Sequence, residues 1–573
     1  MKRLLRYLRQ SLTQTILAPL FKMLEAVFEL FVPLVVADMI DNSHLGTQYL
    51  LTRGGLLLAL GVIGLASAVT AQYFAARAAA RTGTLMRSDL FRHCTALSYT
   101  QMDQTGISTL IQRMTGDINQ VQTGVNMFLR LFLRSPFVVA GAMVMAFTVN
   151  TKAALIFVAV IAALFAVVGL LTKLTMPLYK QNQSRLDAVL RAGREHLTGV
   201  RVVRAFAREE EERDSFAQKG EVLFAGQRKA GHLSALLGPL TYVIINLATV
   251  AVLQVGAVQI DTGILTMGEV IALVNYMSQI LIELVKFSNL IITLSRGMAS
   301  LSRVNDIFAL EPPQTAGQSA CAASCDAPAV ELRNVSFSYH GEGKEALRNV
   351  SFSLRRGQTL GVIGTTGSGK TTLIQLIPAF YPAGSGQVLI DGIRAEEWDS
   401  TALHQKIGIV PQKAQLFSGS IRSNLLWGDE TADDAALWQA LETAQAADFV
   451  RRKDGGLDYE LEANGANLSG GQKQRLCIAR ALVRNPEILI LDDAACALDY
   501  ATDAKLRKAL KSCTQQTAVI LVSQRIATVR GADQILLLED GEVAGLGTHE
   551  QLLHSNEAYR ELCALQLGEE ALG

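Results

Sequence analysis

A short glycine-rich segment between residues 364 and 372 has the residue types and the spacing that hold phosphate groups. It follows the apolar run 359–363, and it consists of Gly364, Thr365, Thr366, Gly367, Ser368, Gly369, Lys370, Thr371 and Thr372. Glycines let backbone N–H groups curl around phosphate oxygens, and a helix that begins at the loop adds the positive end of its dipole. Lys370 would reach the β- and γ-phosphates and Thr371 would coordinate Mg²⁺, so the segment predicts binding of a nucleoside triphosphate.

A carboxylate that could hold the same metal ion closes the apolar run 488–491. This residue is Asp492, and the run before it has the length and composition of a buried strand. In proteins with such phosphate loops, an aspartate at the end of a strand holds Mg²⁺, usually through water. The pattern is weak alone, but downstream of a phosphate loop it supports a shared site for ATP and Mg²⁺.

A third motif lies between these two, and it is a polar, glycine-rich turn. It consists of Leu468, Ser469, Gly470, Gly471 and Gln472, and it can present a serine hydroxyl and N–H groups. With the three motifs together, the chain resembles the ATP-binding cassette (ABC) transporters, specifically the exporter-type half-transporters, over essentially its whole length. The resemblance implies that two cassettes hold two ATP molecules between them. Each site would combine one subunit's phosphate loop with the partner's signature turn, here residues 468–472.

The resemblance extends to further positions. Tyr339 matches the aromatic residue that stacks on adenine, and Gln412 matches a glutamine that touches Mg²⁺ and the membrane domain. Asp499 matches a loop through which the two ATP sites communicate. In the first half of the chain, residues 102–106 resemble the first coupling helix. Residues 199–206 resemble the lead-in to the second coupling helix, which in the family contacts the partner's cassette.

The expected ATP site departs from the family pattern at two positions. Asp493 stands where the family has a glutamate as general base, and Gln524 stands where it has a histidine. Losing one methylene retracts the carboxylate by about 1.5 Å, and a misplacement of about 1 Å can cost on the order of a hundredfold in rate. Gln524 can still hydrogen-bond a γ-phosphate, but it cannot become cationic. In addition, Cys496 replaces the usual serine of the loop before Asp499.

These departures lead to a hypothesis about assembly. The phosphate loop of this subunit is expected to form a degenerate site, which hydrolyses ATP slowly or not at all. Its intact signature, with Ser469, would complete a competent site on a second half-transporter that carries Glu and His at the two altered positions. A weakly active homodimer, or sequence drift without consequence, is the alternative.

The part of the chain before the cassette is unusually apolar. Half of all residues (50%) are hydrophobic and only 18% are charged, and the long apolar runs gather in this part. A segment that crosses a lipid bilayer needs about 20 mostly apolar residues. Six candidate spans meet this need: 15–40, 54–76, 128–149, 153–173, 236–258 and 268–294. We therefore expect a multi-pass membrane protein.

Positive charges orient these spans. Lys and Arg are frequent in the N-terminal flank and in the segments 77–127 and 174–235, whereas the opposite loops carry only Arg53 and Lys152. Since cytoplasmic loops are enriched in Lys and Arg, both termini and the cassette are expected in the cytoplasm of a bacterium, with the spans in its inner membrane. The two long segments are predicted to be helices that continue out of the membrane. Residues 1–10 have the pattern of a basic amphipathic helix on the inner surface, not of a secretory signal.

Charged residues also occur inside the spans, where each costs about 2.5–3.5 kcal/mol on insertion scales. Lys22, Glu25 and Glu29 recur at helical spacing in the first span, and Glu283 and Lys286 do so in the sixth. They indicate a polar translocation pathway or, alternatively, paired charges or residues near the cytoplasmic edge of the membrane. Both interpretations place these side chains away from lipid.

The predicted fold joins two structural classes in one chain. We expect an α-helical six-span transmembrane domain of the type I exporter kind at residues 1–310, a linker at 311–328 and an α/β P-loop cassette at 329–573. In the linker Cys321 and Cys325 lie close together, but no histidine is near them and no metal or disulfide role is expected. The net charge of +1 argues against a nucleic-acid partner.

The expected function is therefore ATP-driven transport across a membrane. Active export of amphiphilic small molecules (drugs, lipids or peptides) follows from the family analogy rather than from particular residues. Uptake by the same fold, for example of siderophores, is the main alternative, because the cassette does not encode a direction. A regulatory subunit whose transport is incidental is a third possibility.

Overall fold

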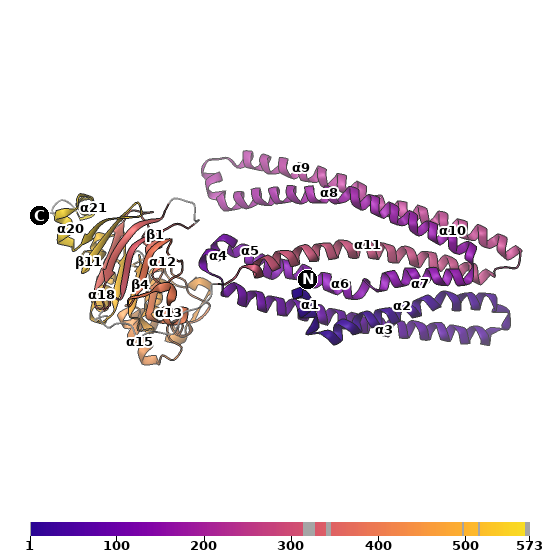
Figure 1. Cartoon of the computed structure of the whole chain (residues 1–573), viewed down its shortest axis with the longest axis horizontal. Coiled ribbons are helices and arrows are strands. Elements are labelled where there is room, and N and C mark those ends of the chain that lie inside the picture. Colours follow the sequence, from indigo (N-terminus) through magenta and orange to yellow (C-terminus); the bar gives the residue numbers. More distant parts are fainter. Residues whose placement is uncertain (1, 313–326, 340–344, 495–497, 514–515, 568–573) are drawn as a thin grey trace. The chain divides into compact units, whose positions relative to one another are not determined.

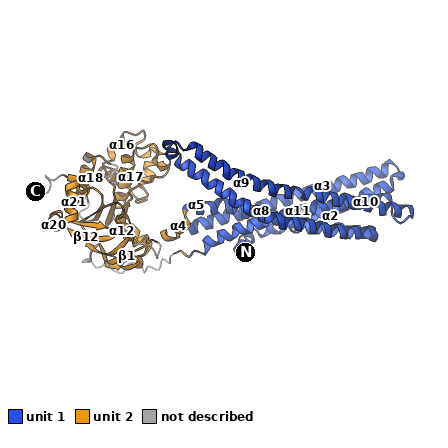
Figure 2. Cartoon of the chain, turned by 90° about the horizontal axis from the view of Figure 1, so that it is seen from above, with its two compact units in different colours: residues 1–95, 107–310 blue, residues 96–106, 311–573 orange. Residues whose placement is uncertain are grey.

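The computed structural model describes residues 2–312, 327–339, 345–494, 498–513 and 516–567. Most of the predicted linker, with Cys321 and Cys325, lies outside these residues, as do Cys496 and Ala497. The chain divides into two compact units (Figure 2). The first comprises Met1–Thr95 and Ile107–Leu310, and the second comprises Ala96–Gly106 and Glu311–Gly573. A short segment from the first half of the chain therefore belongs with the cassette.

The first unit consists of long helices (Figure 1). Its helices are α1 (Lys2–Arg9), α2 (Leu12–Asp41), α3 (Thr47–Thr95), α5 (Ile107–Gln112), α6 (Ile118–Leu131), α7 (Arg134–Val149), α8 (Thr151–Ala205), α9 (Glu209–Ala235), α10 (Leu237–Asp261) and α11 (Met267–Ala309). A π-helical turn, Arg113–Asp117, joins α5 to α6. In this turn Asp117 is buried and accepts hydrogen bonds from Arg113 and Arg303, which fixes the start of α6 against α11.

Five helical segments are long and apolar enough to cross a membrane: Thr47–Thr95, Ile107–Val149, Thr151–Ala205, Glu209–Asp261 and Met267–Ala309. The remaining long helix, α2, has 30 residues and is about 45 Å long at 1.5 Å per residue. It is less uniformly apolar because Lys22, Glu25 and Glu29 lie within it. With α2 counted, the helices agree with the predicted six-span architecture.

The helices extend far beyond the thickness of a bilayer. Helix α8 has 55 residues and α3 has 49, which correspond to about 80 Å and 70 Å against a hydrocarbon core of about 30 Å. The segment 174–235 forms the second half of α8 and all of α9, which lie side by side (Figures 1 and 2). As predicted, helices of this unit continue well beyond the length that is needed to cross the membrane.

The second unit is an α/β structure built on a six-stranded sheet. Its strands are ordered β12 (Glu542–Gly547), β11 (Gln534–Glu539), β3 (Thr359–Gly364), β10 (Ala518–Val522), β9 (Ile488–Asp492) and β6 (Ile407–Val410), with β12 antiparallel and the others parallel. Strands β3 and β9 are almost entirely buried, which explains their continuous apolar sequences. In such sheets ligands bind at the carboxyl ends of the strands, where Gly364 and Asp492 lie.

Smaller elements surround this sheet. A four-stranded antiparallel sheet has the order β2 (Leu347–Leu354), β1 (Val330–Phe337), β4 (Ser385–Ile390) and β5 (Ile393–Arg394), and β7 (Gly419–Ser420) pairs with β8 (Glu460–Leu461). The helices are α4 (Tyr99–Thr105), α12 (Lys370–Leu376), α13 (Ser400–Lys406), α14 (Ile421–Leu425), α15 (Asp434–Thr443), α16 (Ala447–Arg451), α17 (Gly470–Val483), α18 (Tyr500–Cys513), α19 (Ile526–Val529), α20 (His549–Ser555) and α21 (Glu557–Leu567). The fold class predicted for both halves is confirmed.

Candidate functional site

The phosphate loop joins the end of β3 to the start of α12, as its sequence predicts. Gly369 immediately precedes α12 with a φ of +97°, and a Cβ atom at this position would lie 2.7 Å from the Ala346 carbonyl oxygen. Only glycine fits both constraints without strain. The loop therefore makes a tight turn directly before α12. This turn lets the N–H groups of the loop and of the first turn of α12 point toward the same bound anion.

Lys370 is the first residue of α12 and is only 9% exposed. Its Nζ donates to the carbonyl oxygens of Gly364 at 2.8 Å and Thr365 at 2.6 Å. Burial lowers the pKa of Lys370, and the nearby carboxylates of Asp493 and Asp492 oppose this shift. The ammonium group is thus held inside the loop, beside the place that the loop prepares for phosphate.

Asp492 ends β9 and is 6% exposed. The Thr371 hydroxyl donates to its Oδ2 at 3.5 Å. Burial, reinforced by the neighbouring Asp493 carboxylate, raises the pKa of Asp492 to about 6. Burial and the neighbouring negative charge both disfavour the ionised form of Asp492. A cation bound to this carboxylate would offset both effects, so the position favours cation binding.

These residues line one cleft of about 360 Å³. From the predicted site it contains Tyr339, Thr366, Gly367, Gly369, Lys370, Thr371, Thr372, Gln412, Asp492, Asp493 and Gln524. Ala346, Val522 and Ser523 complete the lining, and sequence reasoning did not select them. Val522 and Ser523 could have been found from their position, because Val522 ends the buried parallel strand β10, Ser523 follows it, and both neighbouring strands carry site residues. Gly364, Thr365 and Ser368 belong to the loop but do not line this cleft.

The signature turn is not part of this cleft. Ser469 is the N-cap of α17, where its Oγ accepts from the Gln472 N–H and Gln472 Oε1 accepts from the Ser469 N–H at 3.1 Å. Ser469 and Gly470 are exposed. The reciprocal bonds fix the turn in one conformation, and none of its residues lines the cleft.

Comparison with known proteins identifies the family. Residues 15–284 match the model of the ABC transporter transmembrane region, and residues 347–496 match that of the ABC transporter. YfiB of Bacillus subtilis, described as an uncharacterized ABC transporter ATP-binding protein, is 34% identical over 572 residues, which cover 100% of this chain and 99% of YfiB. The chain belongs to the ABC transporter family.

More distant relatives agree with this assignment. An ATP-dependent lipid A-core flippase of Photobacterium profundum is 29% identical over 93% of this chain and 92% of the flippase. The solved structure of a bacterial Atm1-family ABC exporter with ATP bound has a TM-score of 0.78 and covers 97% of this chain and 98% of that one, at 24% identity. With its transmembrane and ATP-binding parts in one chain, the transporter has the fold of an exporter-type half-transporter.

The two residues that depart from the family pattern both reach the cleft of the transporter. Asp493 has a φ of +45°, and its N–H donates to the Val522 carbonyl oxygen at 2.9 Å. Burial raises the pKa of Asp493, while Arg525, Lys370 and a hydrogen bond from Gln412 oppose the shift. The backbone thus places the short carboxyl group in the cleft wall, and Gln412 reaches it from the segment after β6.

The residues that were predicted to connect the two ATP sites, or the cassette and the membrane domain, lie in or next to three different elements. Asp499 caps α18 by accepting from the N–H and hydroxyl of Thr502, both at 2.9 Å. Helix α4, which contains Asp103, belongs to the second unit. Residues 199–206 form the end of α8, where Phe206 follows the last turn and is 74% exposed.

The charges inside the spans form one paired cluster around Arg134, a residue that sequence reasoning missed. Arg134 begins α7, is 5% exposed, bonds to Glu283 of α11, and places Nη2 2.5 Å from Glu29 of α2. Lys22 pairs with Glu25 at 2.5 Å, and Lys286 pairs with Glu283 at 2.9 Å. The interpretation of these residues as paired charges is thus supported, and the pairs tie three helices together.

Proposed function

We propose that this transporter exports amphiphilic small molecules (drugs, lipids or peptides) as one subunit of a heterodimer, and that the ATP site on this chain is degenerate. The observation that carries the proposal is the placement of Asp493 and Gln524 in the wall of the cleft that contains Lys370 and Asp492. The site retains the residues needed to bind a nucleotide. It lacks the longer carboxylate and the cationic side chain that rapid hydrolysis uses in this family.

The residues of the cleft fit Mg²⁺ together with ATP. Thr371 offers a hydroxyl oxygen, Asp492 a carboxylate and Gln412 an amide oxygen, and Mg²⁺ prefers one or two carboxylates with further oxygen ligands from phosphates. When bound, the metal ion would neutralise charge that develops on the phosphates. Lys370 would exchange its bonds to loop carbonyls for bonds to phosphate oxygens, and Tyr339 would stack on the adenine.

Hydrolysis requires a side chain that orients the attacking water molecule. Asp493 would hold this position, but its carboxyl group is retracted by about 1.5 Å relative to a glutamate. Gln524 could donate a hydrogen bond to the γ-phosphate, but unlike a histidine it cannot add a positive charge. Both changes lower the rate of the chemical step more than they weaken nucleotide binding.

The exposed signature turn supports pairing with a second cassette. Ser469 and Gly470 are well ordered at the start of α17, yet they lie outside the cleft of their own chain. They would complete the ATP site of a partner that carries Glu and His at the altered positions, so that hydrolysis proceeds mainly at that shared site. A homodimer would have two intact signatures and two impaired sites, and it would hydrolyse ATP slowly.

We place the transporter in a bacterial inner membrane with both termini and the cassette in the cytoplasm, on the charge distribution of its loops. The lipid A-core flippases among its relatives support an amphiphilic substrate. An importer of the same fold, for example for siderophores, remains the second candidate, because no residue of the cassette sets the direction.

A flux assay tests the direction of transport. Proteoliposomes that contain this chain and its partner half-transporter, with cassettes facing outward, are given ATP and either a fluorescent lipid analogue or a lipophilic cationic dye. Export predicts ATP-dependent accumulation of a probe inside the vesicles or in their inner leaflet. ATP-dependent loss of a preloaded probe would contradict export and favour uptake.

A further inference from the structure

An aromatic cluster in the second unit connects the cleft to α4. Tyr381 lies at its centre, in the loop between α12 and β4. Its ring is 5.3 Å from that of Tyr339, at an angle of 84°, and 6.0 Å from that of Tyr99 in α4. Its hydroxyl donates to Oδ2 of Asp103, also in α4, at 2.5 Å. Tyr381 therefore contacts a residue of the cleft wall and two residues of α4 at the same time.

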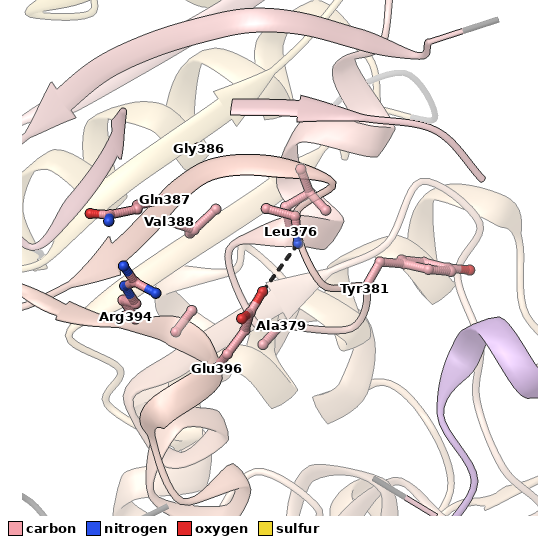
Figure 3. A pocket seen from close by; sticks show the side chains of 10 residues that line it. Leu376, Ala379, Tyr381, Gly386, Gln387, Val388, Arg394 and Glu396 are labelled. Carbon is pink, nitrogen blue, oxygen red and sulfur yellow. Dashed lines mark hydrogen bonds between the residues drawn. The ribbon is translucent and has the colours of Figure 1, made fainter. Parts of the chain in front are cut away.

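The loop that carries Tyr381 is held firmly. The Ala383 N–H donates to Glu396 Oε1 at 3.2 Å, and the Gly384 N–H donates to the Ser336 carbonyl oxygen at 2.9 Å. Figure 3 shows the bond to Glu396 and shows Tyr381 pointing away from the other labelled side chains, toward the purple ribbon of α4. Because its loop is fixed and its ring is buried (8% exposed), Tyr381 cannot turn independently of its neighbours.

On the other side of the cluster, α4 is attached through a second aromatic contact. The Tyr99 ring stacks on Phe380, with centroids 4.5 Å apart. Ser98 and Gln101 form a capping box at the start of α4, and Gln101 Nε2 also donates to the Glu311 carbonyl oxygen at 2.8 Å. Helix α4 is therefore internally ordered and is joined to the loop 380–381 by stacking and by the Asp103 hydrogen bond.

Tyr339 connects the cluster to the nucleotide side. Its hydroxyl lies 3.1 Å from both Thr372 Oγ1 and Gln375 Oε1 and can donate to either, so it is bonded to the helix that follows the phosphate loop. It also meets Phe337 edge-on at 4.9 Å. A base that stacks on Tyr339 must share this ring with Tyr381, and their edge-to-face contact depends on ring orientation.

We propose that Tyr381 is a positioning residue that reports occupancy of the adenine side of the cleft to α4, through its ring contact with Tyr339 and its hydrogen bond to Asp103. This inference rests on the proposed ATP site. It gives the transporter a connection that begins at the base, separate from Gln412, which lies at the phosphate end of the cleft. Burial and the bond to Asp103 raise the pKa of Tyr381, so its hydroxyl remains a donor at physiological pH.

Hydrogen–deuterium exchange on the purified full-length transporter tests this connection. Exchange is followed in peptides covering 96–106 and 364–372, with no ligand, with ATP in the absence of Mg²⁺, and with inorganic tripolyphosphate. ATP should change exchange in both peptides by several-fold. Tripolyphosphate, which has no base, should protect only 364–372.

Tyr381→Phe keeps the ring and removes the bond to Asp103. In this variant ATP should still protect 364–372, but its effect on 96–106 should fall to less than a third. Tyr99→Phe is the matched control, because it keeps the stack on Phe380, and it should behave like the wild type.

Three results would overturn the inference. The first is an unchanged ATP effect on 96–106 in Tyr381→Phe, and the second is an equal effect of tripolyphosphate on that peptide. The third is an exchange rate that Tyr381→Phe raises by the same factor with and without ATP, which indicates a structural role only. Failure of ATP to protect 364–372 in the wild type would instead reject the proposed ATP site itself, and the inference with it.

Discussion

The hydroxyl of Thr371 lies 3.5 Å from Oδ2 of Asp492, although 121 positions separate the two residues. The contact joins the helix after the phosphate loop to the end of β9, and it sets two oxygen ligands side by side. Asp492 is buried beside Asp493, and this raises its pKa to about 6. The same burial that prepares a metal site therefore costs stability while no metal is bound.

This arrangement predicts a pH-dependent effect of Asp492→Asn. The pKa of Asp492 is raised from 3.8 to about 6 in the folded protein. The folded protein therefore favours the protonated form of Asp492. The stability that this preference provides is fully present below pH 3.8 and is lost as the pH rises through 6. Without Mg²⁺, the variant should be more stable than the wild type by about 1–2 kcal/mol at pH 7.5, after allowance for solvent screening, and by about half as much at pH 5.

Apparent melting temperatures of the Mg²⁺-free transporter at the two pH values check this prediction. Asp499→Asn is a suitable control, because the Thr502 N–H lowers the pKa of Asp499. Asp499 is therefore ionised at both pH values, and its replacement should have the same effect at each. An Asp492→Asn effect that does not change with pH would contradict the assigned pKa.

Restoring the family residues in the cleft should restore activity. In a homodimer of this chain both signatures are intact, so only the base and the cationic side chain are missing. Asp493→Glu combined with Gln524→His should raise steady-state ATP turnover of the purified chain by about tenfold or more, because it corrects a misplacement of roughly 1 Å. Asp493→Asn should change the low turnover of the chain alone very little. Equal turnover by wild type and the double variant would refute the explanation by carboxylate length.

The signature serine should matter for the partner's site and not for its own. Ser469→Ala should lower ATP turnover of the heterodimer by at least about tenfold, the order of effect expected when a donor to the transition state is lost. ATP binding to the 364–372 loop should be unchanged. The substitution also removes a helix cap, which costs about 1 kcal/mol.

Thr548→Ala controls for the loss of a cap. Thr548 forms the same capping box with Gln551 at the start of α20. This variant should lower the melting temperature about as much as Ser469→Ala does, while turnover remains near that of the wild type. If both variants lose activity equally, Ser469 acts only through the stability of its helix.

The buried ion pairs of the membrane unit predict a large effect at Arg134. Arg134→Met leaves Glu29 and Glu283 without their shared partner, and removal of one member of a buried pair typically costs about 3–5 kcal/mol. Adding Glu283→Gln should recover part of this loss, which a double-mutant cycle on thermal unfolding in detergent can measure. Arg208→Met removes an exposed pair with Glu211 and should have little measurable effect.

The parts of the structure that local sequence determines could be predicted in advance. The phosphate loop is one, because glycine at 369 and lysine at 370 are required within a single turn between a strand and a helix. The long helices are another, since continuous apolar runs followed by polar helix-forming residues favour helices that continue beyond the membrane, although α8 contains Pro177. The buried strand that ends at Asp492 has the same basis.

Contacts between distant segments could not be predicted in this way. Arg134 lies within the candidate span 128–149, and nothing near it in sequence indicates that Glu29 and Glu283 surround it. The cluster of Tyr99, Tyr339 and Tyr381 brings three aromatic residues from separate elements together without any periodic pattern. In both cases the packing of helices and loops determines which residues meet. The spacing of apolar and polar residues along the sequence does not show which distant elements pack together.

The central claim is that this chain binds ATP in an impaired site and completes a competent one on a different partner. Steady-state ATP turnover of the purified chain alone, compared with that of its complex with the half-transporter that co-purifies with it, tests this claim most directly. We predict at least about tenfold faster turnover by the complex, which Ser469→Ala abolishes and Asp493→Asn leaves intact. Turnover by the chain alone that equals the rate of the complex would contradict the claim.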